Sequence, residues 1–445
     1  MISRTSGGPQ FFPIFVQFNR TPDMNILDTA AVLLTLAAVF GYINHRLFKL
    51  PTSIGILLIG LVLSILLLLF GGDSMRESAD EFVTRIDFNE TVMNVMLSFL
   101  LFAGALHVNL GDLREQRWVV AILASAGLLV STFLVGTASY FVFLWTGLGV
   151  PFLWCLVFGA LISPTDPVAV LGILKKVGVP KSLETKITGE SLFNDGVGVV
   201  VYLVLVGLAV GKAEASILSV GELFLVEVGG GILLGGVIGY AAYWMLKTID
   251  NYQIEILITL ALVTGGYQLA TSWHLSGPLA MVVAGLMIGN HGRLMAMSDT
   301  TREHLDLFWE LIDEILNAVL FLLIGLEIFV LTWSGEAFGA GLILIVVVLV
   351  SRMIAVSLPV LILKKARTFS PGIVRILTWG GLRGGISVAL ALALPKDESL
   401  TGESRQAILM GTYLVVIFSI AVQGLTLKPV ISRLLAKEDG DPTES

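Results

Sequence analysis

The chain has 445 residues, of which 56% are hydrophobic and only 14% charged, and its formal net charge is −7. Soluble domains carry about 25% charged residues, so this composition excludes an ordinary soluble protein and predicts a chain that crosses a membrane many times. The basic residues are scattered between apolar runs and do not form the basic patch of a nucleic-acid-binding protein. The single cysteine and five dispersed histidines exclude a disulfide framework and a zinc site, and we expect no cofactor.

Residues 1–25 contain three prolines and lack the pattern of a cleaved signal peptide, so we expect a flexible N-terminal segment. A helix needs about 20 apolar residues to span a bilayer. We predict an all-α polytopic membrane protein with thirteen transmembrane segments over residues 26–435, followed by an acidic cytoplasmic tail at 436–445. The segments are 26–45, 52–70, 90–108, 118–145, 152–174, 183–210, 218–246, 252–272, 276–290, 308–333, 338–363, 372–394 and 406–434.

The basic residues indicate how the chain is oriented, because Lys and Arg concentrate on the cytoplasmic side. They gather after odd-numbered segments, as do Lys175, Lys176, Lys181 and Lys186 after the fifth and Lys364, Lys365, Arg367 and Arg375 after the eleventh. The even-numbered connections are poor in basic residues. This alternation predicts an outside N-terminus, a cytoplasmic C-terminus and an odd number of crossings.

Two of the segments carry residues that interrupt helices: Ser163-Pro-Thr-Asp-Pro167 in the fifth and Gly380-Gly-Leu-Arg-Gly-Gly385 in the twelfth. Proline removes a helical hydrogen bond and glycine permits non-helical backbone, which at membrane depth must line a cavity or be buried in protein. The breaks lie seven segments apart, an offset that fits two inverted six-helix repeats joined by the seventh segment. Such paired breaks point to the substrate site of a secondary transporter.

The sixth segment carries polar residues suited to such a site. Asp195 and Ser191 lie four residues apart on one face of the expected helix. Asn194 and Glu190 are also four residues apart, on the adjacent face. An acid at membrane depth is by default a functional residue. Sodium is a hard cation that prefers oxygen ligands, and we expect these from Asp195, Asp166, the Ser191 hydroxyl and a carbonyl near Thr165.

Proton coupling follows from the same carboxylate. Burial disfavours the charged form of a carboxylate, so sodium and a proton would compete for Asp195. Only a site neutralised by one of the two ions would cross the membrane, which predicts one-for-one exchange. Because Asn194 cannot ionise, the Asn194-Asp195 pair carries a single charge, and we expect the exchange to be electroneutral.

Two arginines lie in apolar segments and require explanation. Arg352, in the eleventh segment, needs a partner because an unpaired buried charge is strongly destabilising. We expect Glu190 to be that partner, since Asp195 must stay free to exchange ions. Arg383, in the twelfth-segment break, is expected to compensate the partial charges of the broken half-helices.

At these residues the chain resembles the monovalent cation/proton antiporter family of sodium/hydrogen exchangers, in the bacterial NhaP branch. The resemblance runs from about residue 26 to 435. The stretches that carry it are Ser163-Pro-Thr-Asp-Pro-Val-Ala-Val170, Gly189-Glu-Ser-Leu-Phe-Asn-Asp-Gly196, Gly277-Pro-Leu-Ala-Met-Val-Val-Ala-Gly-Leu-Met-Ile-Gly289 and Trp379-Gly-Gly-Leu-Arg-Gly-Gly385.

The resemblance implies a thirteen-helix homodimer in the bacterial inner (plasma) membrane, with a six-helix core domain and a dimerisation domain, working by alternating access. It also implies that Asp195 and Asp166 bind the cation with Ser191, Glu190 and the Thr165 carbonyl, that Asn194 steadies the broken helix, and that Arg352 pairs with Glu190. Ala103 stands where many relatives carry a glutamate, so no role of that acid is carried over.

The sequence therefore predicts a transporter that exchanges Na+ or Li+ for H+ across a lipid bilayer. A K+/H+ exchanger of the same family is the nearest alternative, because the same oxygens can hold either ion. An intramembrane aspartyl protease would use Asp166 and Asp195 as its dyad, but inverted breaks have no purpose in a protease. A cation channel needs a continuous pore with a selectivity filter, and the sequence contains no filter loop.

Overall fold

The computed structural model describes residues 26–72, 92, 96–166, 170, 174, 177, 179–211, 217–293, 297–364, 369, 372–396 and 399–439. Over these ranges every regular element is helical. Eight of the helical stretches are long and apolar enough to cross a membrane. The chain is therefore an all-α polytopic membrane protein. Residues 1–25, expected to be flexible, and residues 440–445, the end of the expected acidic tail, lie outside the described residues.

Most of the described helices are apolar, which suits burial in lipid or against a neighbouring helix. The helices are α1 (Ile26–Ile43), α2 (Thr52–Phe70), α5 (Leu97–Leu106), α6 (Leu110–Ile122), α7 (Leu128–Trp145), α8 (Phe152–Ile162), α10 (Lys181–Ala209), α11 (Ile217–Lys247), α12 (Tyr252–Ser272), α13 (Gly277–Met287), α15 (Asp299–Leu326), α16 (Gly335–Leu363), α17 (Ile373–Trp379), α18 (Gly385–Leu392), α19 (Gly402–Phe418) and α20 (Gly424–Asp439). Short π-helical turns at Leu123–Gly127 and Ser419–Gln423 join α6 to α7 and α19 to α20.

Several helices extend beyond the apolar runs from which they were predicted. The helix expected at 118–145 begins at Leu110, where the Asn109 side chain accepts hydrogen bonds from two backbone N–H groups of the first turn. The helix expected at 308–333 begins at Asp299, capped by Ser298, and its α-helical part ends at Leu326. Polar capping residues fix these ends, whereas hydropathy marks only the membrane-embedded part. Helix α20 likewise runs to Asp439, into the tail expected from 436 onward.

The two interruptions lie where the prolines and glycines predicted them. Helix α8 ends at Ile162, and the backbone from Ser163 to Asp166 is non-helical. Helix α17 ends at Trp379, and α18 begins only at Gly385. Each break brings unsatisfied backbone N–H and C=O groups into the interior, so other parts of the chain must supply hydrogen-bonding partners.

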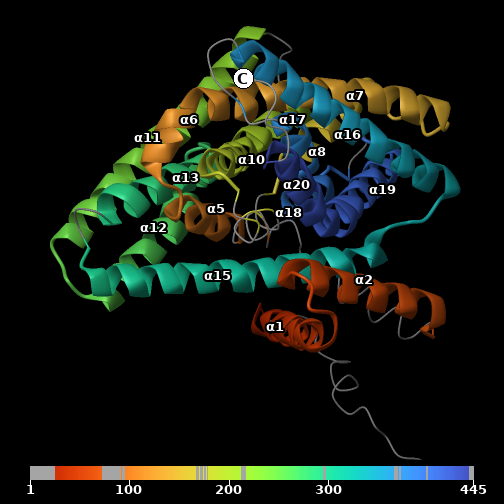
Figure 1. The fold of residues 1–445 in the computed structure, drawn as a ribbon. Coiled ribbons are helices and arrows are strands. Elements are labelled where there is room, and N and C mark those ends of the chain that lie inside the picture. Colours follow the sequence, from red (N-terminus) through yellow and green to blue (C-terminus); the bar gives the residue numbers. More distant parts are fainter. Residues whose placement is uncertain are drawn as a thin grey trace, which may run out of the picture.

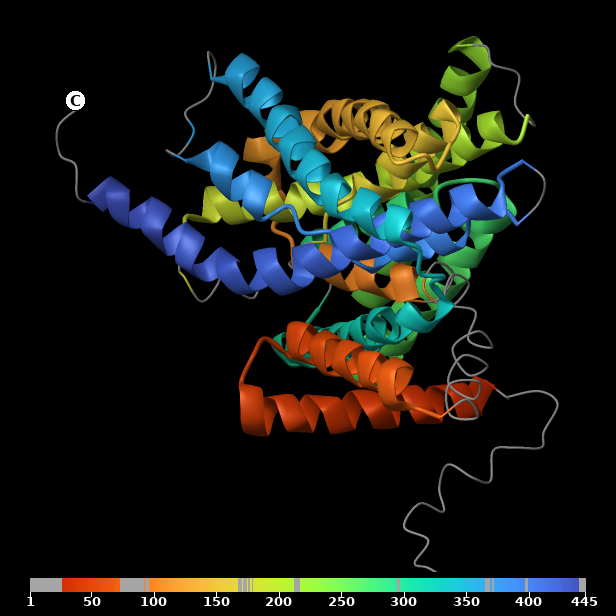
Figure 2. The same cartoon turned by 90° about the vertical axis from the view of Figure 1, so that its right-hand side faces the viewer.

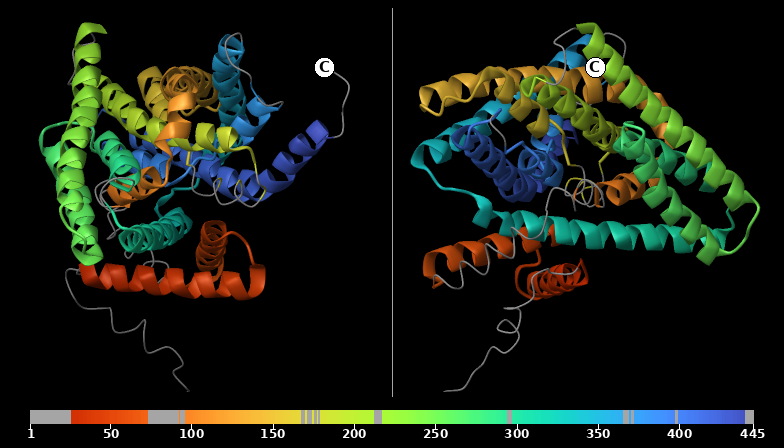
Figure 3. Two further views of the ribbon diagram at one scale, coloured as in Figure 1. Left: turned by 60° about the vertical axis from the view of Figure 1, so that its left-hand side comes forward. Right: turned by 180° about the vertical axis from the view of Figure 1, so that it is seen from behind.

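The helices enclose these breaks. Helix α15 runs across the molecule between the α1–α2 pair and the central helices (Figure 1). Turned by 90°, the molecule shows α1 and α2 side by side at its lower edge (Figure 2). Helices α11, α12 and α13 pack together on one flank, which is clearest from behind (Figure 3). The broken helices α8 and α17–α18 lie at the centre with α10.

Candidate ion-binding site

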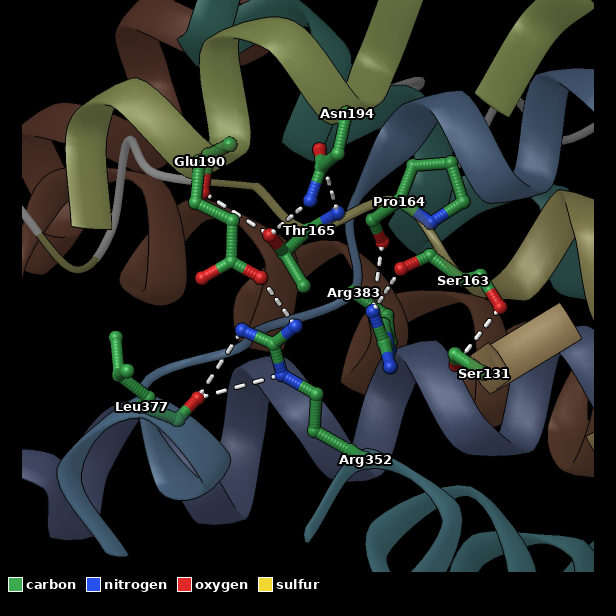
Figure 4. A network of polar contacts seen from close by, with 10 residues as sticks. Ser131, Ser163, Pro164, Thr165, Glu190, Asn194, Arg352, Leu377 and Arg383 are labelled. Carbon is green, nitrogen blue, oxygen red and sulfur yellow. Dashed lines mark hydrogen bonds and ion pairs between the residues drawn. The ribbon is translucent and has the colours of Figure 1, made fainter. Parts of the chain in front are cut away.

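The two broken helices meet at the centre of the protein. The backbone N–H of Asp166 donates to the carbonyl of Leu382 at 2.8 Å. The Arg383 guanidinium donates to the carbonyls of Ser163 and, at 3.0 Å, of Pro164 (Figure 4). Arg383 is buried, and it supplies donors to the carbonyls freed at the end of α8. This is the compensating position expected for it from the sequence.

Close approach of the two backbones depends on a glycine. A Cβ atom added at Gly384 would collide with the side chain of Asp166. Gly384 has an extended backbone with φ of −130°, so the requirement is space rather than an unusual conformation. The glycine-rich stretch thus lets a carboxylate from one break lie directly against the backbone of the other.

Helix α10 holds the first break through Asn194. The Asn194 amide nitrogen donates to the Thr165 hydroxyl at 2.8 Å, and its amide oxygen accepts the Thr165 backbone N–H at 3.3 Å. The Thr165 hydroxyl also lies 3.0 Å from the hydroxyl of Ser191. Asn194 therefore uses both ends of its amide on one residue, which fixes the position of the non-helical segment.

Glu190 and Arg352 form a buried ion pair, as the sequence analysis expected. Their side chains are only 2% and 7% exposed, respectively. The guanidinium also donates from Nε and Nη2 to the Leu377 carbonyl, at 3.4 and 3.2 Å. Arg352 thus ties α16 to α10 and α17 (Figure 4), and its charge is balanced within the protein.

Asp195 and Asp166 face a common cavity of about 1070 Å³. Asp195 is 4% exposed, and its charge lies close enough to that of Asp166 for the two to interact. Pro164 and Thr165 also line the cavity, whereas Glu190, Ser191 and Asn194 are not among its lining residues. The structure therefore places Asp195, Asp166 and Thr165 together at the cavity and leaves the other three behind its wall.

The remaining wall is more acidic than basic, and it includes a side of α15 that the sequence analysis missed. Among the described residues, no group of three or more His, Cys, Asp or Glu side chains is arranged for a metal ion. The charged residues of the wall are Lys49, Asp112, Asp166, Lys181, Glu184, Asp195, Glu310, Asp313, Glu314 and Lys428.

A signal for the α15 residues was present in the sequence. Glu310, Asp313 and Asn317 are spaced by three and four residues, which places them on one face of a helix. They fall inside an expected transmembrane segment, where acids are functional candidates. Their position near the start of that segment made them resemble the polar end of a helix.

Comparison with known proteins identifies the family to which this chain belongs. The model of the family described as sodium/hydrogen exchanger, transmembrane, matches residues 34–433. The chain belongs to this family. A relative from Pseudomonas aeruginosa, the Na(+)/H(+) antiporter NhaP, is 48% identical over 427 residues, which cover 94% of this chain and 99% of the relative. This exchanger chain is also 37% identical to the Na(+)/H(+) antiporter NhaH of Halobacillus dabanensis, over 91% of its own length and 97% of NhaH.

The fold of this exchanger is also found in a solved structure. The sodium proton antiporter MjNhaP1 from Methanocaldococcus jannaschii at pH 8 superimposes with a TM-score of 0.74, covering 93% of this chain and all of that one. The two sequences are 20% identical, so this likeness concerns the fold. The sequence relatives are named as transporters, and the chain is a transporter rather than an enzyme.

Proposed function

We propose that this protein exchanges Na+ or Li+ for H+ across the bacterial plasma membrane. The observation that carries the proposal is the pair Asp195 and Asp166, which face one cavity where two broken helices cross. Carboxylate oxygens suit a hard monovalent cation and also accept protons. The proposal agrees with the Na+/H+ exchange named for the bacterial relatives.

In this proposal the cation is bound by Asp195 and Asp166 together with an oxygen of Thr165. Ser191 and Asn194 act by positioning Thr165, through the contacts of 3.0 Å and 2.8 Å to its hydroxyl. Glu190 acts through its ion pair with Arg352 rather than as a direct ligand. Since the resemblance implied a direct contact from Glu190, this is a narrower role than the sequence suggested.

The charges at the crossing support electroneutral exchange. Glu190 and Arg352 cancel each other. Arg383 brings one positive charge to the crossing, where Asp166 and Asp195 bring two negative charges, so a single net negative charge is left for the transported ion. One Na+ or one H+ neutralises it. The loaded site would then cross without net charge in either direction, while the empty site would carry an uncompensated charge at membrane depth, which is costly.

We further propose thirteen membrane crossings in two inverted six-helix repeats, with a homodimer formed by the helices outside the central bundle and an outside N-terminus. The cavity wall supports this orientation. Lys49 and Lys181 belong to connections predicted to be cytoplasmic, Lys428 lies toward the predicted cytoplasmic end of the last segment, and all three line the cavity. The structure would thus represent the state that opens to the cytoplasm, one of the two states required by alternating access.

The test uses protein in liposomes with a trapped pH-sensitive dye. Gradients of Na+, Li+ or K+ are imposed with and without valinomycin, which clamps the membrane potential when K+ is balanced. We expect a pH change driven by Na+ and Li+ that does not respond to the clamp, and no signal from Asp195→Asn protein. A signal driven by K+ alone would favour a K+/H+ exchanger, a clamp-sensitive signal would refute electroneutrality, and no signal with any cation would overturn the proposal.

A further inference from the structure

Helix α15 presents a graded polar face to the cavity. Glu310 lies near the outer part of this face and is exposed, Asp313 one turn further along is half-buried, and Asn317 another turn along is buried. Leu320 then packs against the α18 glycine Gly385, where an added Cβ would collide with it. This face therefore leads from water toward the crossing of the broken helices.

Asn317 is the unusual member of this face. It is only 3% exposed, yet neither its amide oxygen nor its amide nitrogen has a partner at hydrogen-bonding geometry among the described residues. A buried polar group without a partner costs about 1–3 kcal/mol. Such a group calls for a functional explanation, and Asn317 lines the cavity in which an ion would travel.

One carboxylate, Asp313, lies one helical turn before Asn317 on α15, and a second, Asp166, lines the same cavity. Asp313 is close enough to interact with the Asn317 amide, and the charges of Asp313 and Asp166 also interact across the cavity. Asp166 lies against Gly384, the residue before the glycine that contacts Leu320. A cation between Asp313 and Asn317 would therefore lie on the cavity side of Asp166, next to the central site.

We propose that Asp313 and Asn317 form a second, outer site for a partly hydrated monovalent cation, which holds the ion before it passes to Asp195 and Asp166. The Asp313 carboxylate and the Asn317 amide oxygen are the protein ligands, and water completes the shell. This inference rests on the proposed transport function, because it describes how the same cation reaches the central carboxylates.

A specific cation site on α15 and a merely negative surface there predict different effects of salt and of substitutions. If the acids of α15 acted only through their electrostatic field, their effect on the KM for Na+ would scale with their charge and fall with ionic strength. A ligand role for Asn317 would persist at high salt, and it would be lost in a variant that changes no charge. Asn317→Leu separates the two explanations, and the fold should tolerate it because it replaces an unpartnered buried amide.

The experiment measures Na+-driven proton movement in liposomes against Na+ concentration, at low and high choline chloride. Wild type is compared with Asp313→Asn, Asn317→Leu and the control Glu303→Gln, which removes an exposed charge from α15 outside the cavity wall. We expect Asp313→Asn and Asn317→Leu each to raise the KM for Na+ about fivefold at both salt concentrations, the effect of one lost favourable contact. The control should match wild type.

A second measurement does not depend on transport. In detergent, Na+ should still raise the melting temperature of Asp195→Asn protein relative to choline, because a ligand stabilises the state that binds it, and adding Asp313→Asn should remove that residual effect. Wild-type KM in Asn317→Leu, or no residual Na+ effect in Asp195→Asn, overturns the outer site. Absence of cation-driven pH change in wild-type vesicles would instead refute the proposed function itself.

Discussion

Removal of Arg352 tests the buried ion pair most directly. Arg352→Met keeps an unbranched apolar side chain at this position but removes the guanidinium, so Glu190 is left as an unpaired charge with 2% of its side chain exposed. Breaking a buried pair in this way costs about 3–5 kcal/mol, and the Leu377 carbonyl loses two donors, which adds about 1 kcal/mol. We therefore expect a loss of about 4–6 kcal/mol of folding free energy.

The assay is thermal unfolding in detergent. Unfolding entropy of about 2.1 cal/mol/K per residue converts that loss, over 445 residues, into a melting temperature lower by about 4–6 °C. Arg302→Met is the matched control, because Arg302 pairs with an Asp299 side chain that is 98% exposed, and exposed pairs contribute little. The double variant Arg352→Met/Glu190→Leu should recover most of the loss. Wild-type melting of Arg352→Met alone would refute the reasoning.

The remaining predictions concern transport in the liposome assay. Asp195→Asn should abolish cation-driven proton movement while melting like wild type, and measurable exchange in folded protein would remove Asp195 from the centre of the mechanism. Asp166→Asn should raise the KM for Na+ strongly, and an unchanged KM would exclude Asp166 as a ligand. Gly384→Ala should slow exchange because its Cβ collides with the Asp166 side chain; a wild-type rate would show that this contact can relax. Competition at a single carboxylate should raise the KM for Na+ about tenfold for each pH unit on the acid side, and a KM that is independent of pH would contradict single-site competition.

Much of the candidate site could be predicted from the sequence because its residue types are costly to place in a membrane. Prolines and glycines marked both breaks, and acids in apolar segments marked Asp166 and Asp195. The buried charge of Arg352 requires a partner, for which the sequence indicated Glu190, and the structure contains this ion pair. These inferences depend only on local sequence and on the cost of burying a charge, so they need no knowledge of how the helices pack.

The features of the candidate site that the sequence did not predict depend on how each helix is rotated about its axis. Glu190 and Asp195 are both on α10, yet only Asp195 lines the cavity. Packing sets that rotation, for example at Gly189, where a Cβ would lie 3.0 Å from side-chain atoms of Leu113 and Val120. The role of the α15 face likewise depends on where that helix crosses the molecule. Neither feature is encoded in a short motif.

The crossing of the two breaks also bears on how the protein is made. The bonds that join them link Asp166 to Leu382 and Arg383 to Ser163, residues more than 200 positions apart in the chain. During synthesis, the first break enters the membrane long before its partner exists, with the Ser163 and Pro164 carbonyls still lacking the donors that Arg383 will supply. A ribosome-bound chain that ends before Arg383 would therefore hold both carboxylates without a finished site, and assembly of the site would be among the last steps of biogenesis.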